Sequence, residues 1–71
     1  MDIVEFLIRQ RKQQRIDQKS LLHRLKITAV TMSRYENKSR PMPLIIVEKY
    51  ADEMGFELKL IAKTNTLNNG K

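Results

Sequence analysis

The 71-residue chain contains no cysteine and only one histidine. The absence of cysteine excludes disulfides and thiolate metal sites, and one histidine without cysteine partners argues against a zinc site. No apolar run approaches the ~20 residues that a membrane-spanning helix needs. The N-terminus also lacks the basic stretch and apolar run of a signal peptide. We therefore expect a cytoplasmic protein with no membrane segment and no metal.

Residue combinations that carry catalysis are also scarce. The sequence has no Ser/His/Asp arrangement, no phosphate-binding loop and no metal-ligand spacing. His23 lacks partners of these kinds, and we expect it to be an exposed helix residue. We therefore expect no catalytic residues, no cofactor and no small-molecule substrate. A chain of this length forms one small domain with a core that is marginal by itself, so oligomerisation would help to stabilise it.

Acidic residues are few in one part of the chain. The net charge is +6, but residues 9–40 contain ten of the fourteen lysines and arginines and only two acids, a net +8 for that segment. The remainder has four bases and six acids, a net −2. This concentration of basic residues favours a polyanionic partner, and double-stranded DNA is the first candidate. A solvated surface that keeps the protein soluble is the alternative interpretation.

Hydrophobic spacing predicts two helices in the first third of the chain. The first spans about residues 2–14, where Asp2 is suited to cap it and neither glycine nor proline interrupts it. The second spans about residues 18–25. Asp17 is suited to cap this helix, because its carboxylate can accept hydrogen bonds from first-turn N–H groups. The apolar residues that share one face of the second helix are Leu21, Leu22 and Leu25.

A third helix is predicted over about residues 29–37, with Thr28 as its cap. Ile27, Met32 and Tyr35 are its expected core contacts. A proline-containing loop follows, and a fourth helix is predicted over about 43–54, with Gly55 as its C-terminal stop. The core stripe of the fourth helix consists of Leu44, Val47, Ala51 and Met54, widened by Ile46 and Tyr50.

Residues 17–36 therefore have the outline of two short capped helices joined by a tight turn. The residue pattern resembles the helix-turn-helix of phage-repressor and Cro class regulators, the XRE family. The matching residues are Gln18, Leu21, Leu25, Ile27, Thr28, Met32, Ser33 and Glu36, with Leu7, Arg11 and Ile16 before them and Leu44, Ala51, Met54 and Gly55 after them. Family members usually carry Ala where this chain has Leu22, and Gly where it has Lys26 and Lys38. A turn that requires positive φ costs Lys more free energy than Gly.

The resemblance implies a mainly α, four-helix phage-repressor-like DNA-binding domain whose third helix enters the major groove. The outward residues expected on that helix are Ala29, Val30, Thr31, Ser33 and Arg34. Arg34 can make paired hydrogen bonds to a guanine edge, and Ala29 and Val30 can pack on thymine methyl groups. Thr31 and Ser33 can donate or accept hydrogen bonds at bases or phosphates. The alternative for Arg34 is a phosphate contact without sequence information.

The resemblance also implies phosphate contacts beside the recognition helix. Gln18 contacts a phosphate in the family, and helix N-termini in general favour anions. The full set that we expect to bind phosphate is Gln18, Lys19, Thr28, Asn37, Lys38 and Arg40. An ordinary solvated loop is the alternative for residues 37–43. Arg11 has two interpretations, an internal ion pair with Glu36, which the resemblance favours, or a phosphate contact.

The period of the sequence changes after Gly55. Phe56, Leu58, Leu60 and Ala62 alternate with Glu57, Lys59, Ile61 and Lys63, which predicts a β-strand. A lone strand leaves unpaired backbone groups, so we expect it to pair with the same strand of a second copy across a two-fold axis. The expected dimerisation residues are Phe56, Leu58, Leu60 and Ile61. A short fifth helix is the alternative interpretation.

We expect residues 1–63 to form the DNA-binding domain with its dimerisation strand, and residues 64–71 to form a flexible tail. The pattern as a whole predicts a homodimeric transcriptional repressor that binds a near-palindromic operator. The terminal strand also resembles that of HipB- and HigA-type antitoxins. The alternative function is therefore an antitoxin that binds a toxin and represses its own operon.

Overall fold

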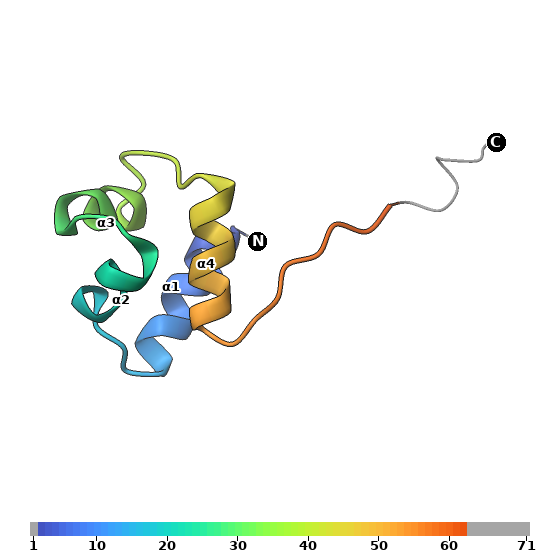
Figure 1. Ribbon diagram of the computed structural model, residues 1–71, viewed down its shortest axis with the longest axis horizontal. Coiled ribbons are helices and arrows are strands. Elements are labelled where there is room, and N and C mark those ends of the chain that lie inside the picture. The colour runs from blue at the N-terminus through green and yellow to red at the C-terminus, as the bar shows by residue number, and fades with distance from the viewer. Residues whose placement is uncertain (1, 63–71) are drawn as a thin grey trace.

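The computed structural model describes residues 2–62 and contains, within that range, four helices and no strand. Helix α1 spans Ile3–Gln13, α2 spans Gln18–Leu25, α3 spans Ala29–Glu36 and α4 spans Leu44–Glu53. The predicted four-helix architecture is confirmed, and each helix end lies within one residue of its predicted position. Residues 56–62 have no regular secondary structure, and the chain leads away from the helices beyond the contacts of Phe56 and Leu58 (Figure 1). Lys63 and the predicted tail, 64–71, lie outside the described residues.

Side-chain caps fix the starts of two helices as predicted. At α1, Asp2 Oδ1 accepts a hydrogen bond from the Val4 backbone N–H at 2.9 Å. At α3, Thr28 Oγ1 accepts from the Thr31 backbone N–H at 3.2 Å. At α2 the prediction was wrong in one respect, because Asp17 is the N-cap residue but its carboxylate accepts no capping hydrogen bond. The backbone carbonyl of Asp17 accepts from the Ser20 N–H instead, at 3.1 Å.

The core lies where the four helices meet. Its buried residues are Leu7, Leu21, Leu25, Met32, Tyr35, Ile46, Val47, Tyr50, Ala51 and Met54. Met32, Tyr50 and Ala51 are completely buried. One predicted core residue is wrong, because Leu44 remains 64% exposed. As the first residue of α4, it precedes the turn that carries Ile46 and Val47 into the core.

Two lysines occupy the left-handed backbone region at helix ends. Lys26 follows α2 with φ 57°, and Lys38 follows α3 with φ 66°. These are the two positions at which the XRE resemblance leads us to expect Gly. Gly55 follows α4 with φ 92°, so it ends that helix as predicted. Because a side chain crowds the carbonyl in this region, each lysine carries a conformational cost of ~1–2 kcal/mol.

Replacing Lys26 with glycine is therefore expected to stabilise the fold by roughly 0.5–1 kcal/mol. The relief of left-handed strain is partly offset by the greater unfolded-state entropy of glycine. Denaturant unfolding followed by circular dichroism measures the change. The matched control is Lys19→Gly, an exposed lysine inside α2, which is expected to destabilise by about 1 kcal/mol. A Lys26→Gly protein less stable than the wild type would contradict the strain assigned to this turn.

Candidate nucleic-acid interface

Helix α3 has two different faces. Met32 and Tyr35 are buried against the other helices, whereas Val30 is 59% exposed and Ser33 and Arg34 are also exposed. Residues three or four positions apart lie on the same side of a helix, so Val30, Ser33 and Arg34 share one outward surface. Ala29, at the start of the helix, is exposed as well. Four of the five residues predicted to read bases therefore lie on the exposed part of α3.

Thr31, the fifth predicted base-reading residue, has a different environment. It is half-buried, and its hydroxyl oxygen accepts a hydrogen bond from the Thr28 hydroxyl at 3.0 Å. Thr28 Oγ1 in turn accepts from the Thr31 backbone N–H. Both side chains are thus part of the cap of α3. Thr28, although exposed, has its hydroxyl engaged in this cap.

The carboxylate of Glu36, at the end of α3, collects hydrogen bonds from the other three helices. Arg11 of α1 donates to it from Nε at 3.0 Å and from Nη2 at 2.8 Å. Tyr50 of α4 donates from its hydroxyl at 2.6 Å, and Gln18 of α2 donates from Nε2 at 2.8 Å. The internal ion pair predicted for Arg11 is confirmed. All four helices are joined at this one carboxylate.

The guanidinium of Arg11 is almost fully withdrawn from water. The Arg11 and Glu36 side chains are 9% and 7% exposed. Arg11 Nη1 donates to the backbone carbonyl of Ile16 at 2.7 Å, and its Nε also lies 3.1 Å from the Tyr50 hydroxyl. Charges this buried require partners, because a single unpaired charge in the interior is strongly unfavourable. The phosphate interpretation of Arg11 is therefore excluded by its position.

The cluster holds Glu36 in its charged form. Burial by itself raises the pKa of the Glu36 carboxyl, but hydrogen bonds from Arg11, Tyr50 and Gln18 outweigh burial, so its pKa lies below the ordinary value of 4.5. Burial opposes the charge of Arg11 too, but contact with Glu36 keeps the pKa of Arg11 above its ordinary value. Burial and then the hydrogen bond to Glu36 raise the pKa of the Tyr50 phenol. At neutral pH the cluster is an ion pair with a neutral phenol.

Two residues predicted to bind phosphate have partners inside the protein. Gln18 is half-buried, and its side-chain N–H donates to Glu36. Lys38 forms ion pairs with Asp2 and Glu5, which both belong to the start of α1. Hydrogen bonds to Asp2 and then Glu5 raise the pKa of the Lys38 ammonium. The lysine therefore ties the loop after α3 to the start of α1.

The other predicted phosphate-binding residues, Lys19, Asn37 and Arg40, are exposed. The Asn37 side-chain oxygen accepts from the Ser39 N–H at 2.9 Å, and the Arg40 N–H donates to the Arg34 carbonyl at 3.3 Å. These bonds fold the loop back on the end of α3. None of the ion pairs formed within residues 2–62 involves Lys19, Arg34 or Arg40. These three cations can meet a polyanion without first breaking such a pair.

The predicted dimerisation residues differ in exposure. Leu58 is half-buried against the core, and Phe56 packs edge-to-face on Phe6 with 5.2 Å between ring centroids. Leu60 and Ile61 are 99% and 85% exposed. Residues 56–62 form neither the predicted strand nor the alternative fifth helix in the single chain. A strand needs a pairing partner, so pairing with a second copy stays a prediction.

The sequence did not predict the side-chain contacts of three residues, Tyr50, Asp2 and Glu5. Tyr50 was expected only to widen the apolar stripe of the fourth helix, yet its hydroxyl contacts Glu36 and Arg11. The available signal was its residue type, since a buried tyrosine hydroxyl usually needs a hydrogen-bond partner. Asp2 and Glu5 lie more than thirty residues from Lys38 in sequence. No local spacing could have connected them.

Two other features are absent from the described part of the chain, a group of metal ligands and a membrane-spanning helix. Within residues 2–62, no three His, Cys, Asp or Glu residues are grouped so that they could hold a metal ion. No helix in that range has the length and apolar character needed to cross a membrane. His23 is exposed on α2, as expected. Comparisons with protein-family models, curated proteins and solved structures found no match for this chain.

The variant Glu36→Gln is expected to destabilise the fold by about 3–5 kcal/mol, because it leaves the buried charge of Arg11 without its counterion. Denaturant unfolding at neutral pH measures this loss. Glu53→Gln is the matched control. Glu53 pairs with Arg24 at 3.6 Å near the surface, and its loss is expected to cost less than about 1 kcal/mol. Equal losses for the two variants would contradict a special role for the cluster.

The same pair predicts the pH dependence of stability. The pKa of Glu36 is lowered by folding, so its contribution is fully present above the ordinary value of 4.5 and is lost as pH falls through the lower native pKa. The stability difference between wild type and Glu36→Gln should therefore shrink on acidification. Unfolding curves across this acidic range test the sign. A difference that grows at low pH would contradict it.

Proposed function

We propose that this chain is a homodimeric, sequence-specific DNA-binding regulator that uses α2 and α3 as a helix-turn-helix. The observation that carries the proposal is the outward surface of α3, where Val30, Ser33 and Arg34 are exposed together. The opposite side of α3 is anchored by Met32, Tyr35 and Glu36. A rigidly anchored helix with a mixed apolar, hydroxyl and guanidinium surface suits a major groove.

In this proposal each exposed side chain of α3 makes a different contact with the DNA. Arg34 donates two hydrogen bonds to the O6 and N7 atoms of a guanine, the commonest specific contact of an arginine in the major groove. Val30, more than half exposed, packs on a thymine methyl group. Ser33 donates to or accepts from a neighbouring base edge or phosphate. Ala29 allows the start of the helix to approach the bases closely.

Phosphates are bound around this surface by groups that differ in how much they must rearrange. Arg40 and Lys19 are exposed cations on either side of α3 in sequence. The first turn of α2 offers backbone N–H groups to an anion. The Gln18 side-chain N–H would have to leave Glu36 to reach a phosphate, so we assign its contact to the backbone of that first turn. Lys38 would have to exchange Asp2 and Glu5 for a phosphate.

Two copies related by a two-fold axis would read two half-sites. Recognition helices about 34 Å apart would contact major grooves one helical turn apart, which predicts a near-palindromic operator. Occupancy of such a site across a promoter would exclude polymerase, so repression is the proposed outcome. A reporter whose output rises when the protein occupies its natural promoter would contradict repression, although not DNA reading.

Selection of duplexes from a random pool tests the proposal directly. The selection is carried out at about 0.15 M salt, where binding driven by charge alone is weakened. The expected result is a recovered palindrome whose half-site centres are one helical turn apart. A pool that binds without sequence enrichment would contradict sequence reading and leave a charge-driven binder. A pool that does not bind at all would contradict the DNA-binding proposal itself.

A pair of arginine variants separates base reading from phosphate binding. Arg34→Ala is expected to lose about 1–3 kcal/mol on the selected site and to relax preference at one base pair in each half-site. Arg40→Ala is the control of the same residue type and is expected to weaken selected and random duplexes alike, with a shallower salt dependence. Titration of both duplexes with both variants measures these effects. Equal losses on both duplexes for Arg34→Ala would make Arg34 a phosphate contact.

A further inference from the structure

The exposed large apolar side chains of this protein are not evenly distributed. Seven occur within residues 2–62, and only Val30 belongs to α3. The other six are Ile3, Leu44, Ile45, Phe56, Leu60 and Ile61. They come from the start of α1, the start of α4 and the segment after α4. Single exposed apolar residues are ordinary on a protein surface, whereas a group drawn from three adjoining elements indicates a binding surface.

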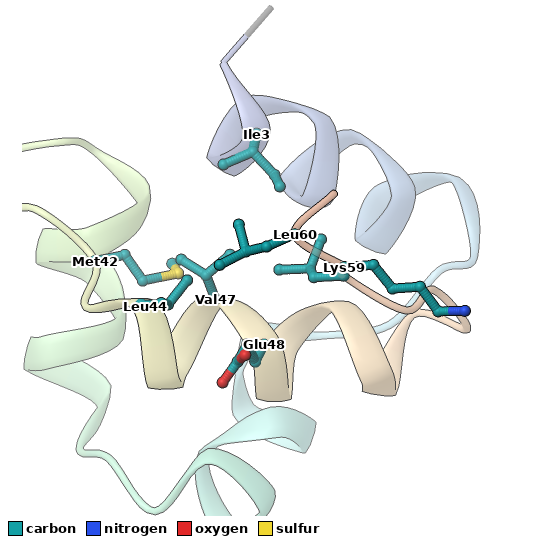
Figure 2. A pocket seen from close by; sticks show the side chains of 8 residues that line it. Ile3, Met42, Leu44, Val47, Glu48, Lys59 and Leu60 are labelled. Carbon is teal, nitrogen blue, oxygen red and sulfur yellow. The ribbon is translucent and has the colours of Figure 1, made fainter. Parts of the chain in front are cut away.

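Three of these residues line one groove. Ile3, Leu44 and Leu60 border a cavity of about 600 Å³ between the start of α1, α4 and residues 58–60. Its remaining apolar lining comes from Met42, Val47 and Leu58. Figure 2 shows the side chains of Met42, Leu44, Val47 and Leu60 gathered on one side of α4, with Ile3 above them. We call this surface the α1–α4 groove.

We propose that the α1–α4 groove is the surface on which a second copy of this chain docks. The inference rests on the proposed dimeric regulator and identifies the surface by which it dimerises. The first argument is charge complementarity. The groove is lined by one acid, Glu48, and one base, Lys59. In a two-fold dimer each contact occurs twice, so Glu48 of each copy can pair with Lys59 of the other. Lys59 would exchange only an exposed 3.8 Å contact with Glu57 of its own chain.

The second argument concerns what the proposed strand pairing needs. An isolated two-stranded ribbon is marginally stable in water and requires an apolar surface behind it. A stable interface also buries roughly 800 Å² on each partner, which a few scattered residues do not supply. Leu58 already packs against the core, and Leu60 belongs both to the predicted strand and to the groove. The groove thus provides the apolar support that strand pairing lacks.

The position of the groove fits the proposed DNA contact. Helix α3 and residues 56–62 lie on opposite sides of the helical body (Figure 1). A second copy docked between the starts of α1 and α4 would therefore leave Val30 and Arg34 accessible. The apolar part of the surface would bind protein, while the exposed surface of α3 would bind DNA.

The test is the oligomeric state of the full chain without DNA, measured by sedimentation equilibrium over micromolar to submillimolar concentrations. The groove variants are Leu44→Glu and Leu60→Glu. An acidic side chain is favourable in the first turn of α4, and Leu60 is 99% exposed, so both variants should fold. The control is Val30→Glu, since Val30 is 59% exposed against 64% for Leu44. Circular dichroism verifies helix content in each variant.

We expect a wild-type dimer whose dissociation constant rises at least about tenfold in each groove variant and is unchanged in Val30→Glu. Glu48→Lys and Lys59→Glu should each weaken the dimer, and the double variant should restore it. A wild-type chain that stays monomeric throughout overturns the inference. Groove variants that dimerise like the wild type overturn it as well, because the interface would then lie elsewhere.

Co-expression with the adjacent gene product separates a second copy from a foreign partner. A stable complex that forms only with an intact groove, from a chain that is monomeric alone, would overturn the inference and favour the antitoxin alternative. Failure of the DNA-binding proposal is detected by a different measurement, the selection from the random duplex pool. If the groove variants abolish a wild-type dimer but the random pool shows no enrichment, sequence reading fails and the groove remains the dimer interface.

Discussion

The fold depends on the hydrogen bonds that one buried carboxylate accepts. Glu36 ends α3, and its oxygens accept hydrogen bonds from side chains of α1, α2 and α4. Each helix is short, and helices of eight to eleven residues have little stability in isolation. A buried ion pair adds little net stability over an apolar substitute of the same shape. Its hydrogen bonds nevertheless constrain the geometry, because they bring side chains from α1, α2 and α4 to one point at the end of α3.

That directional constraint determines what α3 offers to solvent. With Glu36 and Tyr35 fixed on the inner side, residues on the opposite side of the helix must point outward, and Val30, Ser33 and Arg34 do so. Arg11 and Tyr50 hold the carboxylate at the end of α3, although neither belongs to this surface. The proposed base-reading function is supported from inside the protein by residues that contact no base.

Local patterns predicted much of this structure, and long-range choices of partner explain the rest. Helix bounds, the caps at Asp2 and Thr28 and most of the core follow from spacing within one helix. Leu44 matched the apolar spacing of α4 but lies at its first residue, where no neighbouring helix covers it. Gln18 and Lys38 have the chemistry of phosphate ligands. In the fold, however, Gln18 donates to the carboxylate of Glu36 and Lys38 pairs with that of Asp2. Residues 56–62 alternate like a strand, but alternation cannot form a strand without a partner.

The positive charge concentrated in residues 9–40 is partly neutralised in the fold by ion pairs with acidic residues. Residues 9–40 hold ten bases, but Arg11, Arg24 and Lys38 each pair with an acid, and for Arg24 and Lys38 that acid lies outside this segment. The electrostatic field at α3 therefore depends more on which cations lie near it without an acidic partner than on the net +8 of the segment. Arg34 on α3 and Arg40 in the loop after it form no ion pair inside residues 2–62, so both contribute to this field. In the proposed function, discrimination between DNA sequences rests on the base contacts of α3, because phosphate contacts carry no sequence information.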